Sequence, residues 1–97
     1  MNDLPVALLK NGKEHSKVIP STIYQPIRAS SLEDGQNHIV VIDGPVSATN
    51  GDLHALKFSS GLTVPSDIQS CRVGVEGWEL CVRVWPGETK EARAEAD

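Results

Sequence analysis

The chain has few aromatic residues and no long apolar run. Phe, Trp and Tyr make up only 4% of its 97 residues, so Val, Ile and Leu must supply most of the core. No run approaches the roughly 20 apolar residues of a membrane-spanning helix. The opening MNDLPVALLK also lacks the basic segment and the long apolar segment of a secretory signal. We therefore expect a cytoplasmic protein with no membrane span, whose small core could be supplemented by assembly into a homo-oligomer.

Charge of neither sign is concentrated enough to suggest nucleic acid as a partner. The formal net charge is −4, and residues 87–97 carry four acids against two bases. This segment has no large apolar side chain, which predicts a frayed acidic tail behind a single β-rich domain of residues 1–86. The rest of the chain has no basic stripe of the kind that drives nucleic-acid binding. It also lacks the dense carboxylates of a DNA mimic.

Cysteine and histidine are sparse and widely spaced. The two cysteines and three histidines all lie at least ten residues apart, whereas zinc ligands usually come in closely spaced pairs. Cys81, expected to lie opposite Arg72, is the better nucleophile candidate, but no oxyanion-loop or orienting motif accompanies it. The single glycines lead into no helix, as a phosphate-binding loop requires. We predict two free thiols, no metal, no cofactor, no catalytic residue and therefore no enzyme.

The clearest structural signal is the stretch 70–85, SCRVGVEGWELCVRVW. Apolar and polar residues alternate through it, and the phase changes at the Glu-Gly pair in its middle. Such alternation around a glycine-containing turn predicts two antiparallel strands with one buried face. We expect Val75 to pair with Trp78 and Val73 with Leu80, because this register places the apolar side chains on a common face. Cys71 would share that face, and Cys81 would lie on the other.

Two further hairpins are suggested by turn residues. In the stretch 53–64, a three-residue loop ending in Gly61 would pair Phe58 with Leu62 and Leu56 with Val64. Asn11-Gly12 follows the apolar stretch 4–10 and is a strong hairpin signal as well. Pairing across it opposes two lysines, however, which favours the strand over residues 4–10 more than the hairpin.

The remaining patterns complete a fold that is mainly β. Residues 38–43 (HIVVID) predict a strand buried on both faces, and residues 21–25 a short edge strand. One helical turn is expected over residues 31–34, closed by Gly35, and a turn over residues 65–67. The prediction is a small antiparallel sheet of five or six short strands with little helix, arranged as a meander, a barrel or a compact sandwich.

The second face of the last hairpin is the best candidate for a binding surface. It would present Arg72, Glu79, Arg83 and Trp85, and Trp and Arg are enriched at binding hot spots. Glu79 would lie opposite Gly74. The competing interpretation is that another layer covers this face, so that Trp85 belongs to the core and Glu79 is a solvated strand carboxylate.

Three non-enzymatic functions fit this sequence. The favoured one is a small cytoplasmic binding protein of the accessory or inhibitor type, encoded by a phage or mobile element, that acts by occupying a partner protein. The second is an oligomer that clamps a small anionic aromatic ligand, such as a nucleotide, with Arg72, Arg83 and Trp85. The third is an assembly subunit that pairs through a free strand edge.

Overall fold

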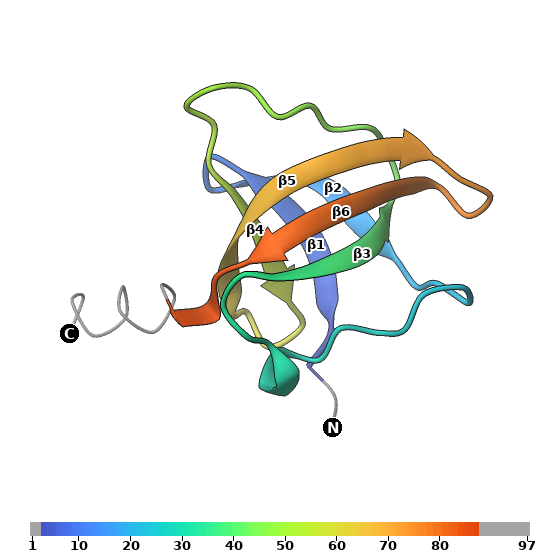
Figure 1. Ribbon diagram of the computed structural model, residues 1–97. Coiled ribbons are helices and arrows are strands. Elements are labelled where there is room, and N and C mark those ends of the chain that lie inside the picture. The colour runs from blue at the N-terminus through green and yellow to red at the C-terminus, as the bar shows by residue number, and fades with distance from the viewer. Residues whose placement is uncertain (1–2, 88–97) are drawn as a thin grey trace.

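A computed structural model describes residues 3–87, which form six antiparallel strands closed into a barrel (Figure 1). Neighbouring strands follow the order β1-β2-β3-β6-β5-β4, and closure leaves each strand with a partner on both sides. Of the three arrangements left open by the sequence, the barrel is the one that forms. The predicted acidic tail lies outside the described residues, apart from its first residue. The elements are β1 (Pro5–Lys10), β2 (Lys13–Ile19), η1 (Ala29–Ser31), β3 (Gln36–Ile42), β4 (His54–Phe58), β5 (Thr63–Val73) and β6 (Trp78–Val84).

The first two strands, β1 and β2, form a hairpin, although the sequence favoured a strand over residues 4–10 more than a hairpin because pairing would oppose two lysines. Asn11 and Gly12 have φ values of 52° and 81°, the left-handed pair that a two-residue turn needs. Lys10 does lie opposite Lys13. Its ammonium nitrogen, however, is 3.5 Å from the Asp52 carboxylate. That carboxylate also accepts a hydrogen bond from the Asn11 side chain at 3.1 Å. Asp52, in the segment just before β4, therefore offsets the repulsion between Lys10 and Lys13.

The barrel turns a corner within β5, where the sequence predicted a turn over residues 65–67. That prediction is wrong, because β5 continues through these residues. Its first part pairs with β4, and the part from Ser66 onward pairs with β6. Pro65 is tolerated at this change of partner, since it needs no amide hydrogen there and its carbonyl accepts from the Trp85 amide at 2.9 Å.

Two predicted strand features at the core are confirmed. β3 carries three consecutive buried residues, Val40, Val41 and Ile42, as expected for a strand covered on both faces. In the β4–β5 hairpin Leu56 pairs with Val64. The main core cluster is almost wholly aliphatic and has one aromatic ring at its centre; its buried members are Leu8, Ile27, Val40, Ile42, Val46, Leu56, Phe58, Val64, Leu80, Val82 and Val84.

The connection between β2 and β3 crosses one end of the barrel. Residues 21–25 are a loop and not the predicted edge strand, and the helical turn lies at 29–31 instead of 31–34. Ile27 is buried in the core, and the Ala29 amide donates to the Asp3 carbonyl at 3.0 Å. These long-range contacts hold the connection in place without a strand ladder. Within residues 3–87 no helix has the length and hydropathy needed to cross a bilayer.

The last hairpin differs from its predicted register by two residues. Val73 lies opposite Trp78, and the Gly74 amide donates to the Gly77 carbonyl at 2.7 Å, closing a four-residue loop. Val73 and Val75 are therefore not core residues but are 70% and 88% exposed. The reason is that β5 from Ser66 onward pairs only with β6, so Val73 has no strand on its other side, and Val75 lies beyond the last β3–β6 pair, Ile42 with Trp78.

The two cysteines face as predicted, although with different partners. Cys71 lies opposite Leu80 and packs against the core, whereas Cys81 lies opposite Ser70 instead of Arg72. The two-residue difference in register accounts for both changes of partner, and a further register shift follows between Ile68 and Ser70. Both thiols are free.

Candidate functional site

The β5–β6 hairpin projects from the barrel (Figure 1). Exposed apolar side chains lie at its end and on the neighbouring loop. Five large apolar residues of the described chain are well exposed, and three of them, Ile23, Val73 and Val75, lie on the hairpin end or on the loop bonded to it. We call these three residues, together with Arg72 and Tyr24, the tip surface. Isolated exposed apolar residues are ordinary, but a group on one projecting element is typical of an interaction site.

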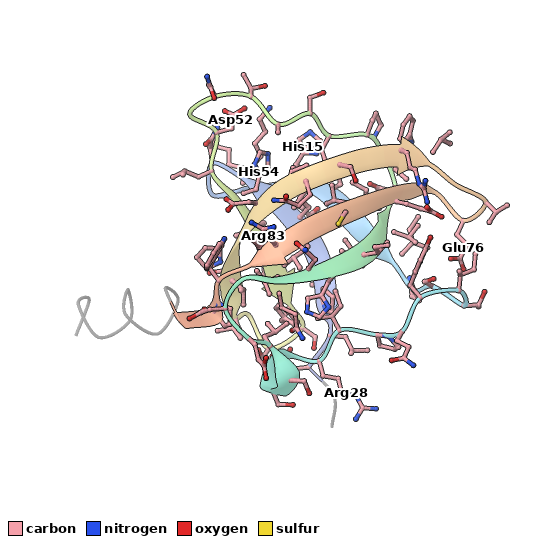
Figure 2. All side chains as sticks on the ribbon, viewed as in Figure 1. His15, Arg28, Asp52, His54, Glu76 and Arg83 are labelled. Atoms are coloured by element: carbon pink, nitrogen blue, oxygen red, sulfur yellow. The ribbon has the colours of Figure 1, made fainter. Side chains whose placement is uncertain are left out.

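Glu76 fastens the hairpin end to the loop before β3. Its carboxylate accepts from the Ser21 hydroxyl at 2.6 Å, from the Thr22 amide at 2.8 Å and from the Thr22 hydroxyl at 3.1 Å. These hydrogen bonds, the one from Ser21 above all, lower the pKa of Glu76. Figure 2 shows Glu76 between the two segments. Because charged acceptors make the stronger hydrogen bonds, the arrangement holds the apolar side chains in a preset position.

The loop has its own internal support. The Ser21 hydroxyl oxygen accepts hydrogen bonds from the backbone amides of Ile23 and Tyr24, at 3.0 and 2.9 Å. Serine commonly organises a turn in this way. The same hydroxyl therefore shapes the loop and donates to the hairpin, so the position of Ile23 depends on both segments.

Arg72 and Glu79, two of the four predicted binding residues, form an ion pair at the base of the tip surface. They lie opposite each other on β5 and β6, with Arg72 Nε 3.1 Å from Glu79 Oε1. The Arg72 side chain is 76% exposed and that of Glu79 only 14%. Glu79, and then the Tyr24 hydroxyl, raise the pKa of Arg72. The predicted neighbour of Glu79, Gly74, is not its strand partner, although the carboxylate lies against it.

Gly77 brings the hairpin close to β3. A β-carbon placed on it would lie 2.8 Å from the Ile42 carbonyl oxygen, 2.9 Å from Val41 Cγ1 and 3.2 Å from Ile19 Cδ1. Only glycine allows so close an approach, and its φ of +153° also disfavours other residues. The direction in which the tip projects is therefore set by a backbone contact.

Arg83 and Trp85, the other two predicted residues, lie toward the opposite end of β6. Arg83 Nε donates to the Asn37 side chain at 3.4 Å, and Trp85 Nε1 donates to Asp67 at 2.9 Å. Trp85 is six residues beyond Glu79, or about 20 Å along an extended strand. It lies on the outside of the barrel and is partly buried, so neither a core position nor a clamp with Arg72 describes it.

Sequence reasoning missed the apolar part of the tip surface and the residues that support it. Val73 and Val75 were assigned to the core because their alternation continued that of β5. Glu76 offered only a weak signal, a carboxylate inside a turn, because its donors lie more than 50 residues away in the chain.

An apolar pocket opens beside the tip surface. It has a volume of about 350 Å³ and lies between the start of β1, the end of β2 and the middle of β3. Ser21 and Tyr24 belong to its wall as well as to the hairpin junction, and Tyr24 is the only ionisable residue in the lining. Such a pocket suits an uncharged side chain or ligand, because an unpaired charge there would lose hydration.

In the described part of the chain, no three His, Cys, Asp or Glu side chains are placed to hold a metal ion. Comparisons of the sequence with protein-family models and with curated proteins, and of the fold with solved structures, gave no match. A function for this protein therefore has to be argued from the chemistry of its own surface.

Proposed function

We propose that the protein is a small, non-enzymatic, cytoplasmic binding protein of the accessory or inhibitor type that acts by occupying a partner protein through the tip surface. One observation carries the proposal: three exposed apolar side chains lie on the hairpin end and on the loop that the hydrogen bonds of Glu76 join to it. A surface ordered before binding loses less conformational entropy on association, so more of the contact energy appears as affinity.

The apolar side chains of this surface supply part of the contact energy that a complex needs. Complete burial of a Val or Ile side chain is worth about 1.5–3 kcal/mol, so the three side chains together offer at most about 4.5–9 kcal/mol before association costs. The apolar pocket beside them could receive one further side chain of the partner. Arg72, largely exposed beside this apolar group, supplies a residue type common among binding hot spots.

Two alternatives have less structural support. A clamp on an anionic aromatic ligand needs Arg72 near Trp85, and the fold separates them along β6. Assembly by adding a strand needs unpaired backbone, which the ladders leave only in part, as along residues 66–73 of β5, whose ladder partner is β6 alone. The proposal therefore rests on side chains at the hairpin end and not on the sheet edges.

Capture experiments with two matched variants test the proposal. Val75→Asp places a charge at the centre of the tip surface, and Leu53→Asp places the same charge at a 75% exposed leucine outside it. Proteins retained from a lysate of the natural host cells by each form are quantified by mass spectrometry. The leading candidate is then purified and its affinity measured by calorimetry.

We expect the partner to bind wild type and Leu53→Asp alike and Val75→Asp at least about tenfold more weakly. Both exposed positions should leave the fold unchanged, which circular dichroism checks. Equal binding by Val75→Asp, or equal loss by Leu53→Asp, would show that the tip surface is not the contact.

A further inference from the structure

A second cavity, separate from the tip surface, lies where the pairing of β4 with β5 ends. Its volume is about 550 Å³, and Asp52, His54, Asp67 and Trp85 contribute to its wall. Leu53 and Pro65 supply apolar surface beside them. The cavity thus combines an aromatic ring, apolar walls and carboxylates, which is a common composition for small-molecule sites.

Asp67 brings an exposed carboxylate to the wall of this cavity. Its Oδ2 accepts a hydrogen bond from Trp85 Nε1 at 2.9 Å, which positions the carboxylate beside the indole ring. Arg83 is its partner across the ladder, but the Arg83 guanidinium donates to Asn37 on the far side. Among residues 3–87, no cationic group lies within ion-pair distance of Asp67.

The remaining charges leave this cavity acidic at neutral pH. Asp52 is balanced by Lys10, 3.5 Å away. Burial lowers the pKa of His54, and Lys10 and His15 add to that effect against the opposing influence of Asp52 and Asp67. Figure 2 shows His15, His54 and Asp52 on the same side of the barrel. A neutral His54 leaves the lining of this cavity without a cationic side chain.

We propose that this cavity binds a small organic cation, a protonated amine with an apolar portion. The ammonium group pairs with Asp67 and lies against the face of Trp85, while the apolar portion contacts Leu53 and Pro65. The expected charge is opposite to that of the ligand suggested by the Arg and Trp residues in the sequence. The proposal does not depend on the tip surface.

Nuclear magnetic resonance can test this site directly, because the chain has only two tryptophans. Their two indole N–H signals are assigned with Trp85→Phe. The protein is titrated with phenethylamine, and with 2-phenylethanol and phenylacetate as neutral and anionic probes of similar size. We expect phenethylamine to shift the Trp85 signal saturably and to leave the Trp78 signal in place, with weaker effects from both other probes.

Asp67→Asn removes the charge and retains an oxygen that can accept from Trp85. It should weaken phenethylamine binding about fivefold. Glu33→Gln, at an exposed carboxylate outside the cavity, is the matched control and should leave the affinity unchanged. Equal shifts from all three probes, no saturable shift, or unchanged affinity in Asp67→Asn would each overturn the proposal. These readouts do not involve the protein partner, so they fail or succeed independently of the proposed function.

Discussion

Gly77→Ala tests the close approach that aims the hairpin. The alanine β-carbon would lie 2.8 Å from the Ile42 carbonyl oxygen and 2.9 Å from Val41 Cγ1. Val41 is 1% exposed and packed in place, and a backbone oxygen cannot move aside as the end of a flexible side chain can. The substitution therefore forces the hairpin away from β3 or strains both.

Gly12→Ala is a matched control, since Gly12 also has a positive φ, +81°, but no atom lies within 4 Å of the added carbon. Its cost is the backbone strain alone, about 1–2 kcal/mol. At Gly77 a strained backbone of about 1–3 kcal/mol adds to an overpacking cost of about 1–3 kcal/mol, which makes about 2–6 kcal/mol in all. Because a domain of this size has a stability of about 5–15 kcal/mol, the difference between the variants is measurable.

Urea unfolding followed by tryptophan fluorescence measures both variants, because Trp78 follows Gly77 directly. We expect Gly77→Ala to lose clearly more free energy of unfolding than Gly12→Ala, and to bind the partner more weakly at a given folded concentration. The reasoning is refuted if the two variants are equally stable, since the contact between hairpin and β3 would then cost nothing to disturb.

Two further predictions concern the core and the histidines. Phe58→Ala should lower the free energy of unfolding by about 3–5 kcal/mol, because the ring is fully buried among aliphatic side chains; a loss below about 2 kcal/mol in urea unfolding would contradict this packing. Burial lowers the pKa of His38 and His54 from their ordinary value of 6.5, so below that pH the unfolded chain binds more protons and stability should fall. The urea midpoint should therefore be lower at pH 5.5 than at pH 7.5, and His54→Gln should reduce this difference between the two midpoints. Identical midpoints in the wild type, or a difference that His54→Gln leaves unchanged, would argue against the prediction.

The strands could be predicted where local pattern and turn chemistry agreed. In β4 and β5 the pairing of Leu56 with Val64 follows from Gly61 and from alternation alone. The buried run in β3 could be predicted equally well, because several consecutive apolar residues suit a strand covered on both faces. In both cases the determining contacts are close in sequence or internal to one strand.

Long-range contacts decided the features that sequence reasoning got wrong. The Asn11-Gly12 hairpin forms beside Asp52, which lies some 40 residues further along the chain. Residues 21–25 are a loop, in part because Glu76 takes the Ser21 and Thr22 donors. Neither partner can be identified from the local pattern.

The sequence by itself determined a mainly β chain, most of its strands, and the faces on which Cys71 and Cys81 lie, because side-chain alternation is a local property of extended backbone. Only the tertiary structure decided which apolar residues are buried. Val73 and Val75 continue the alternation of β5, but the end of β5 pairs only with β6, and Val75 lies beyond the last pair of β3 with β6. Burial requires a neighbour that alternation does not supply. The same holds for the four predicted binding residues: only the strand pairing shows that Arg72 and Glu79 lie near the turn of the last hairpin and Trp85 just beyond the far end of β6.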